Sequence, residues 1–486
     1  MSRPLSEFLS TQSSPRILIV GDIIVDRYQY GSTSRISPEA PIVVMAAERD
    51  EQKLGGCGNV AANLGALGAE TRVVSVIGDD YGGRVIRELL AEAGCSDSGL
   101  VVDASRPTTR KTRIVSQNQQ LLRIDEEVTG APSAEVEAQL LDRIEAESAN
   151  VDIIVVSDYG KGVLTERILD RLCRNQGGPR VLVDPKGHDY ARYRGASLIT
   201  PNRVEAEAAT GLKLDTVEDV REAAKQLAAQ TDLDSVIITL GPQGMYCRMR
   251  DGSREWSIPA RARAVYDVTG AGDTVIAVIA FSLAVGADLE QAMRLATVGA
   301  GLTVQRFGVA AITREDMENA LLESSRLSGK VVGAEELLKR LAHERSEGRR
   351  IVFTNGCFDV LHVGHLSYLQ EARAYGDVLV LGVNSDASVK RLKGDGRPVN
   401  KHEDRMALLS GLECVSLVTG FDEDTPLELI KTVSPDVLVK GEDWADKGVV
   451  GREWVEEHGG HVVLARLHGG YSSTGTLQRM GLEDPT

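Results

Sequence analysis

The chain has 486 residues, with 55 Lys and Arg against 71 Asp and Glu, which gives a formal net charge of −16. Its hydrophobic fraction of 42% and its 49 glycines are typical of a globular α/β protein and exclude a collagenous or disordered chain. Negative charge repels polyanions, so we expect no binding to nucleic acid and none to an anionic membrane. The length indicates two or three domains.

The cysteines and the apolar segments indicate where the protein works. The six cysteines show no CxxC or Cys/His ligand spacing, so we expect neither a disulfide framework nor a metal site built from protein ligands alone. The N-terminal segment lacks the apolar region of a signal peptide. The longest apolar stretch, residues 275–287, is shorter than the roughly 18–20 residues of a membrane-spanning helix and predicts a buried helix. We therefore expect a soluble, cytoplasmic protein.

Short β-branched runs that end at polar or glycine-rich loops recur from residue 16 to residue 244, among them RILIVGD, VDIIVVSDYGKG and SVIITLGPQG. Such runs are typical of parallel strands buried on both faces. Helical stretches with capping residues lie between them, for example residues 133–149 and 216–230. This alternation predicts a doubly wound α/β sheet whose ligands bind at the carboxyl ends of the strands.

A second cycle of strand, loop, helix and strand begins at about residue 350, after a charged and mostly helical stretch. This cycle needs a sheet of its own. The sequence therefore predicts a first domain over residues 1–327, a helical linker over 328–349 and a second domain over 350–486.

The strongest signal in the first domain is DVTGAGDT, residues 267–274, which leads directly into the apolar helix. Glycines there allow backbone N–H groups to converge at the helix N-terminus, where they and the helix dipole can bind an anion. Asp273 beside that site is a candidate general base that takes a proton from a sugar hydroxyl as the γ-phosphoryl group arrives. The GAGD motif by itself is equally consistent with an ordinary N-terminal helix carboxylate.

Other polar groups follow predicted strands. Carboxylates after the first strand and the glycine-rich stretch GGCGNVAANLG suit recognition of a polyol, while NRVE after SLITP suits a magnesium and phosphate network. The sugar-binding candidates are Asp22, Asp26, Gly56 and Asn59. The ATP- and phosphate-binding candidates are Asn202, Arg203, Val204, Glu205, Gly241, Gly244, Gly270, Ala271 and Gly272.

These motifs, in this order over about residues 15–320, resemble the ribokinase-type carbohydrate kinase family. The resemblance implies that Asp273 is the base, that Ala271 and Gly272 form the anion hole, and that Asn202 and Glu205 serve magnesium and phosphate. It also implies a small β lid near residues 27–48 and 105–125. Arg110 and Lys111 in that lid could meet an anionic group on the sugar, and a solvated edge strand is the alternative.

The strongest signal in the second domain is TNGCFDVLHVGH, residues 354–365. A strand leads into a glycine turn and then into a helix whose first turn carries His362 and His365, where phosphate would bind. Donors at that position would stabilise charge on an α-phosphoryl group as pyrophosphate leaves. The spacing is not HExxH and has no evident third ligand, which argues against a metal site.

This segment resembles the cytidylyltransferase-like nucleotidyltransferase superfamily, from about residue 350 to the end. The resemblance implies that Thr354, His362 and His365 hold the triphosphate and that Lys393 and Lys440 neutralise phosphates. Ser473 and Thr474 would cap a helix against the β and γ groups, although Gly475 replaces a second Thr of the family. The remaining nucleotide-binding candidates are Asn355, Phe358, Asn384, Asp386 and Arg405. The predicted fold is a ribokinase-like doubly wound α/β sheet with a β lid, followed by a Rossmann-like α/β nucleotidyltransferase domain.

The two motif sets in one chain closely resemble the bifunctional heptose 7-phosphate kinases and heptose 1-phosphate adenylyltransferases of lipopolysaccharide-core synthesis. The resemblance implies ATP and Mg²⁺ as cofactors and heptose phosphates as substrates, with a separate phosphatase acting between the two steps. We also expect a homodimer. Two alternatives stay open: another sugar kinase joined to a cytidylyltransferase, because no residue selects adenine over cytosine, and an inactive nucleotide sensor, against which intact Asp273, His362 and His365 argue.

Overall fold

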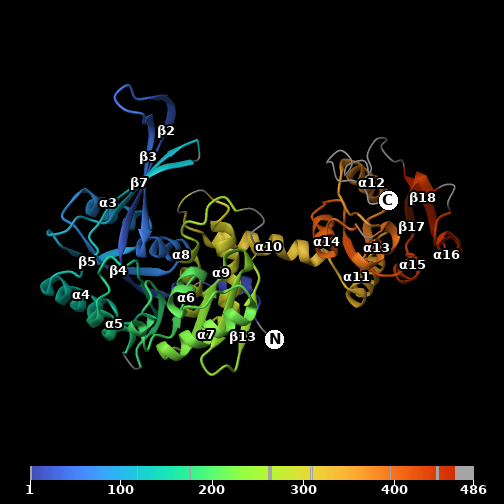
Figure 1. Ribbon diagram of the computed structural model, residues 1–486. Coiled ribbons are helices and arrows are strands. Elements are labelled where there is room, and N and C mark those ends of the chain that lie inside the picture. The colour runs from blue at the N-terminus through green and yellow to red at the C-terminus, as the bar shows by residue number, and fades with distance from the viewer. Residues whose placement is uncertain are drawn as a thin grey trace. The chain divides into compact units, whose positions relative to one another are not determined.

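The computed structural model describes residues 3–11, 13–117, 119–174, 177–260, 265–306, 308, 310–394, 396–444 and 448–465, without the side chains of 323–328 and 443. The chain forms two compact units, Met1–Leu321 and Leu322–Thr486, and the boundary falls within helix α10 (Arg314–Lys330) (Figure 1). No helix in the described part of the chain is long and apolar enough to span a membrane.

A nine-stranded sheet forms the centre of the first unit, in the order β13-β12-β11-β10-β9-β8-β1-β4-β5. Strands β5 to β11 in that order run parallel, whereas β12 and β13 at one edge run antiparallel. The strands are β1 (Arg16–Gly21), β4 (Glu70–Ile77), β5 (Ser96–Val102), β8 (Ile153–Ser157), β9 (Arg180–Asp184), β10 (Leu198–Ile199), β11 (Ser235–Thr239), β12 (Met245–Met249) and β13 (Glu255–Ile258).

Helices cover both faces of this sheet. The alternating side chains of β1 show the two faces: Ile17 and Ile19 belong to one apolar core, and Leu18 and Val20 belong to the other. The first core includes residues of α1 (Leu5–Leu9), α2 (Cys57–Ala66), α3 (Tyr81–Glu92), α8 (Ala271–Ala284) and α9 (Leu289–Thr303). The second includes residues of α4 (Ala134–Glu147), α5 (Glu166–Cys173), η1 (Tyr190–Tyr193), α6 (Arg203–Thr210) and α7 (Val217–Thr231). The doubly wound sheet is confirmed.

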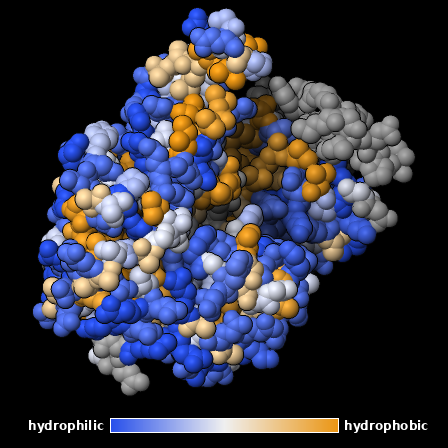
Figure 2. All heavy atoms as spheres, turned by 60° about the vertical axis from the view of Figure 1, so that its left-hand side comes forward, coloured by the Kyte–Doolittle hydropathy of each residue, from blue (hydrophilic) through white to orange (hydrophobic). Residues whose placement is uncertain are grey.

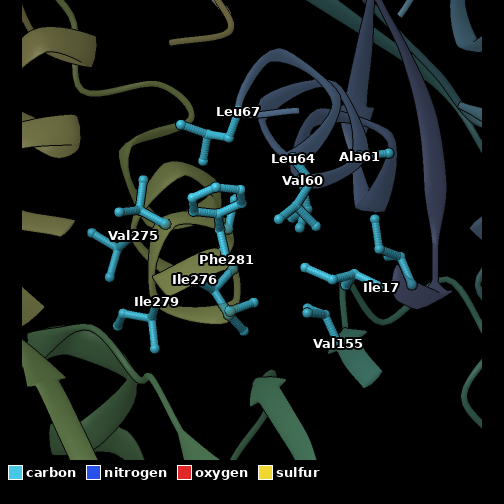
Figure 3. Close-up of a cluster of buried hydrophobic side chains, with 14 of the residues drawn as sticks. Ile17, Val60, Ala61, Leu64, Leu67, Val155, Val275, Ile276, Ile279 and Phe281 are labelled. Carbon is cyan, nitrogen blue, oxygen red and sulfur yellow. The ribbon is translucent and has the colours of Figure 1, made fainter. Parts of the chain in front are cut away.

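Helix α8 is buried along most of its length, as the apolar run predicted. In Figure 3, Val60 and Leu64 of α2 lie beside Phe281 of α8, with Ile17 and Val155 contributed by the sheet. A helix that is apolar on all sides is stable only inside a core. Packing on all sides therefore fixes the position of the α8 N-terminus, which carries Asp273.

A four-stranded lid sheet, in the order β3-β2-β6-β7, projects from the body of the first unit (Figure 1). Its strands are β2 (Ile23–Ile36), β3 (Val43–Gly56), β6 (Arg110–Ser116) and β7 (Gln119–Glu126). The expected lid is confirmed, and its first hairpin is longer than the sequence indicated. The pairing runs back to Ile23 opposite Gly56, so the glycine-rich stretch begins inside a lid strand.

The second unit contains a five-stranded parallel sheet in the order β16-β15-β14-β17-β18, with helices on both faces. Its strands are β14 (Ile351–Gly356), β15 (Val378–Asn384), β16 (Leu417–Phe421), β17 (Val437–Gly441) and β18 (His461–Ala465). Its helices are α11 (Ala334–Ser346), α12 (Val363–Arg373), α13 (Asp386–Lys393), α14 (His402–Ser410), α15 (Leu427–Val433) and α16 (Arg452–Glu457). The Rossmann-like order is confirmed, and the strand order reverses between β14 and β17, where such sheets bind ligands.

The segment expected as a linker, residues 328–349, contains helix α11, whose Leu337 and Leu341 are fully buried with strand residues of the second unit. Val331 also pairs with Val418 in that unit. The division into a first domain over residues 1–327, a helical linker over 328–349 and a second domain over 350–486 stays a prediction.

Candidate active sites

The carboxylate of Asp273 is held between two hydrogen-bond donors from different elements. Helix α8 begins after Gly270, whose φ of +78° places it in the left-handed region, and Asp273 lies in the first turn. Its Oδ2 accepts a hydrogen bond of 2.7 Å from Nδ2 of Asn59, and its Oδ1 accepts one of 2.8 Å from the hydroxyl of Tyr159. Asp273 is only 5% exposed. This carboxylate is therefore oriented before any substrate binds.

Burial raises the pKa of Asp273 to about 6, the hydrogen bonds from Asn59 and Tyr159 lower it in part, and the charge of Asp26 raises it. A carboxylate that ionises near pH 6 is matched to proton transfer near neutral pH. It is ionised at pH 7 and still basic enough to accept a proton.

A cavity of about 270 Å³ lies at the start of α8. Four residues that the sequence placed near ATP line it together: Gly241, Gly244, Ala271 and Gly272. The sequence reasoning missed the apolar wall, which is formed by Val265, Val268, Val275, Ala300 and Val304. Val268 and Val275 lie within or directly after the DVTGAGDT motif, but the other three lie outside any motif, so the sequence did not show that they form one wall. The cavity suits a flat, apolar-faced group such as a nucleobase.

The NRVE segment forms the N-terminus of α6. Asn202 and Glu205 form a capping box, with bonds of 2.9 and 3.0 Å between each side chain and the other's amide. Glu205 also accepts a hydrogen bond of 2.8 Å from Nζ of Lys186, a residue that the sequence motifs did not indicate. The guanidinium of Arg203 bonds to the Leu214 carbonyl, and Val204 is 71% exposed. The segment lies near the cavity because Asn202 pairs with Thr239, which lines it.

The expected sugar-binding carboxylates already have partners in the structure. Asp22 accepts hydrogen bonds from the amides of Tyr159, Lys161 and Val163, at 2.9, 3.0 and 3.1 Å. Asp26 pairs with Arg113 across β2 and β6. Gly56 is the residue that precedes α2, and Asn59 lies in the first turn of that helix beside Asp273.

The two basic lid candidates are paired with acidic residues of the lid. Arg110 bonds to Glu126 at 2.6 Å, and Lys111 lies 3.2 Å from Asp125 and 3.5 Å from Glu127. An anionic group on a sugar would therefore have to compete with these carboxylates for the same cations.

The two histidines of the second unit stack at the start of α12. Their ring centroids are 3.9 Å apart, and the ring of Phe358 meets His365 edge-on at 5.4 Å. Phe358 has φ of +47°, a strained backbone conformation for a bulky residue that is found most often at functional sites. Burial, together with electrostatic interactions with His362 and Lys393, lowers the pKa of His365 to about 4. His365 is therefore neutral at pH 7.

Polar groups from β14 and β17 meet where the strand order reverses. Nζ of Lys440 donates to Oδ1 of Asn355, and it lies 5.3 Å from the ring centre of Trp444. The hydroxyl of Thr354 is fully buried and bonds to Tyr368 at 2.7 Å, so it supports the strand-to-helix turn. The structure thus brings Asn355 and Lys440 together at the predicted edge.

Arg405 is fully buried and fixes the backbone around the histidine loop. It donates to the carbonyls of Cys357 and Asn400, at 2.6 and 3.0 Å, and to Asp386 at 2.7 Å. Asn384 donates 3.0 Å to Ser388. The sequence reasoning missed a second buried support, the ion pair of Asp359 with Arg397. Ser473 and Thr474 lie outside the described residues.

Comparisons with known proteins define the class. Residues 14–316 match the pfkB family of carbohydrate kinases, and residues 353–466 match the cytidylyltransferase-like family. Arabidopsis thaliana ribokinase complexed with ribose and ATP shares the fold at 21% identity and a TM-score of 0.53, covering 64% of this chain and 99% of that one. Escherichia coli phosphofructokinase-2, in complex with substrates and products, shares the fold at 19% identity and a TM-score of 0.54. The match covers 64% of this chain and 99% of that one. The protein is a carbohydrate kinase joined to a nucleotidyltransferase.

Three relatives match over nearly their whole lengths. The bifunctional protein HldE of Citrifermentans bemidjiense is 44% identical over 481 residues, covering 98% of this chain and 99% of that protein. HldE of Geotalea uraniireducens is 45% identical over 485 residues, with 99% of each covered. HldE of Paramagnetospirillum magneticum is 47% identical over 471 residues, with 96% of each covered. The chain belongs to the bifunctional HldE family, as its two motif sets indicated.

Proposed function

We propose that the first unit phosphorylates O1 of D-glycero-β-D-manno-heptose 7-phosphate with ATP, and that the second transfers AMP from ATP to heptose 1-phosphate. The products of the second step are ADP-heptose, for the lipopolysaccharide core, and pyrophosphate. The observation that carries this proposal is the buried Asp273 carboxylate, oriented by Asn59 and Tyr159 at the start of α8 and beside the cavity.

In the first step, the anomeric hydroxyl of the heptose donates to Asp273, which removes its proton as the oxygen attacks the γ-phosphorus of ATP. The leaving group is ADP, whose base fits the apolar cavity by the GPQG turn. Amides at the start of α8, from Ala271 and Gly272, bind the phosphoryl oxygens as charge develops on them. Asn59 keeps the carboxylate facing the sugar.

Magnesium is the cofactor that phosphoryl transfer of this kind requires. The residues fit it: burial and the charges of Asp273 and Glu205 raise the pKa of Asp184, so a cation beside these carboxylates would relieve repulsion. Asp184 and Glu205 would hold the ion, with Lys186 exchanging its contact with Glu205 for a phosphate. Bound Mg²⁺ supplies charge neutralisation at the phosphates.

In the second step, a phosphate oxygen of heptose 1-phosphate attacks the α-phosphorus of ATP, and pyrophosphate leaves. His365, whose ring is neutral at pH 7, and His362 donate hydrogen bonds to the phosphates. Lys440 and Lys393 offset the growing charge of the leaving group. Arg405 and Asp359 act through the backbone, since their buried contacts fix the loop that carries the histidines.

We expect the interface of the homodimer to lie on the lid. All residues of β7 are exposed, including Leu121, Leu122 and Ile124, which are 48%, 56% and 47% exposed. Figure 2 shows apolar side chains along the raised lid. An exposed apolar edge strand is a liability in a monomer and is normally covered. A second copy of the lid would cover it.

A nucleotide and sugar screen tests the proposal. Purified protein is incubated with Mg²⁺, ATP or CTP, and either heptose 7-phosphate, heptose 1-phosphate or a hexose 6-phosphate control, and the products are identified by mass spectrometry. We expect heptose 1,7-bisphosphate and ADP-heptose with pyrophosphate. CDP-heptose as the main product, or faster phosphorylation of the hexose phosphate, would contradict the assignment.

A further inference from the structure

We propose that Tyr159 is a positioning residue for the catalytic base, and that Asp22 holds the loop of residues 158–163 so that the Tyr159 hydroxyl orients the Asp273 carboxylate. This inference rests on the proposed kinase function of the first unit. It assigns a role to the SDYG segment, which lies outside the motifs that indicated the family, and it gives Asp22 a supporting role in place of sugar binding.

Tyr159 and Asn59 hold the two oxygens of Asp273 separately. Tyr159 donates a hydrogen bond of 2.8 Å to Oδ1, and Asn59 donates a hydrogen bond of 2.7 Å to Oδ2. Asn59 is itself fixed, because Asn63 donates to its side-chain oxygen at 3.2 Å and so turns its amide group toward Asp273. Burial and the Asp273 charge raise the pKa of Tyr159 well above its usual value, so its hydroxyl remains a donor. Two donors on different elements fix the plane of the carboxylate.

The loop that carries Tyr159 is held by hydrogen bonds to the carboxylate of Asp22. This side chain is 1% exposed and accepts the amides of Tyr159, Lys161 and Val163 at 2.9 to 3.1 Å. Three backbone amides can converge on one carboxylate only if the loop curls around it. Asp22 follows β1 and the loop follows β8, and these adjacent strands mark the point where the strand order reverses.

The same loop is held at its other side. Asp158 accepts the Gly160 amide at 2.8 Å and the buried Tyr193 hydroxyl at 2.7 Å. Gly162 has φ of +94°, and a Cβ there would lie 2.1 Å from the Gly130 carbonyl oxygen. These contacts hold the loop in a compact conformation. Tyr159 of this loop contacts the carboxylate of Asp273.

A base among other carboxyl groups needs such donors. Asp26 from β2, Asp184 from β9 and Cys57 from α2 couple electrostatically to Asp273, and ionisation of any of them disfavours its charged form. Tyr159 and Asn59 are the donors that favour it. Loss of one such hydrogen bond raises a carboxyl pKa by about half to one unit and slows a reaction that depends on its orientation by about tenfold.

The test is Tyr159→Phe in the full-length protein, measured as kcat and KM of heptose phosphorylation across pH 4.5 to 9. We expect kcat to fall about tenfold and the acid limb to move up by about half to one pH unit, with the KM for ATP changed less than about twofold. Tyr190→Phe is the matched control, because that buried hydroxyl has no hydrogen-bond partner among the described residues. It should leave kcat and the profile unchanged.

An unchanged profile in Tyr159→Phe would overturn the inference, and so would a loss of kcat without movement of the acid limb. A changed KM for ATP with an unmoved limb would point to a general packing defect and would also overturn it. Asp273→Asn is assayed alongside: if that variant keeps full kinase activity, the proposed function fails, whatever Tyr159→Phe does. Asp22→Asn, which keeps the shape of the side chain but weakens its hold on the three amides, should move the limb in the same direction as Tyr159→Phe.

Discussion

At the scale of single residues, the first unit depends on a carboxylate kept in an environment that disfavours its charge. Asp273 is buried at the start of an apolar helix, and two neutral donors stabilise its ionised form in part. A carboxylate in water would be too weak a base to accept a proton efficiently at pH 7. Burial of the Asp273 charge thus lowers the stability of the folded protein and raises the basicity of the carboxylate.

The pH dependence of the kinase reaction should report this pKa. Asp273 must be ionised to act, and burial raises its pKa to about 6, so kcat/KM for the sugar should fall tenfold per pH unit below about pH 6. Steady-state rates between pH 4.5 and 8 measure this directly. The Asp273-independent nucleotidyltransferase reaction of the same chain is the control. A kinase acid limb near pH 4 would contradict the buried-base assignment.

Removal of the ionisable group should change how the stability of the first unit depends on pH. Because the pKa of Asp273 is raised in the folded state, its contribution to stability is full below the unfolded pKa near 4 and is lost as pH rises through about 6. Asp273→Asn removes this titration, so the free energy of unfolding of the variant relative to the unaltered protein should rise by about 1–3 kcal/mol between pH 4 and pH 7, on top of a constant cost for the hydrogen bond that the Asn side chain cannot accept. Urea unfolding at several pH values checks this, and a stability difference that does not change between pH 4 and pH 7 would contradict it.

Part of the candidate site could be predicted from sequence because its residues belong to short motifs. Gly241, Gly244, Ala271 and Gly272 line one cavity, since the first two lie in the turn between β11 and β12 and the other two lie at the start of α8. The role of Tyr159 could not be predicted in that way. It depends on a contact across 114 positions in the chain, which only the packed sheet brings about. The catalytic roles themselves stay predictions.

At the scale of elements, the sheets and helices followed from periodicity, and the strand ends did not. The lid hairpin extends to Gly56 because Ile23 pairs opposite it, and side-chain pattern alone does not show how far a hairpin continues. Likewise, α11 gave a charged helical pattern typical of a linker, yet Leu337 and Leu341 are enough to anchor it in a core. Burial of two side chains per helix is a weak sequence signal.

Charged substitutions on β7 should weaken self-association. Leu122→Lys combined with Ile124→Lys places two charges on an exposed apolar strand, where a second copy would have to bury them. Sedimentation equilibrium should show a dimer for the unaltered protein and at least tenfold weaker association for the variant. Val217→Lys, on an exposed position of α7, is the control and should change nothing. Equal association of all three proteins would place the interface elsewhere.

At the scale of the whole molecule, each unit has its own sheet and its own apolar cores. Met317 lies in a core of the first unit, and Val332 lies in a core of the second, with the side chains of 323–328 outside the description. A domain with its own core can fold alone. The fusion therefore joins two units that each have the apolar cores a domain needs.

Separated fragments should each keep one activity. Residues 1–327 expressed alone should phosphorylate the heptose within about threefold of the full chain, and residues 328–486 should form ADP-heptose to a similar extent, because each retains its cores. Circular dichroism and the two assays check both. A second fragment that folds only when it begins near residue 350 would show that residues 328–349 are not part of that domain.

The most direct test of two independent active sites is a crossed comparison of Asp273→Asn and His365→Ala in the full-length protein, with both half-reactions followed by mass spectrometry. Asp273→Asn should lower heptose phosphorylation by about 10²–10⁴-fold and leave ADP-heptose formation unchanged. His365→Ala should lower ADP-heptose formation by about 10²–10³-fold and leave phosphorylation unchanged. Loss of both activities from either substitution, or of neither, would contradict the account.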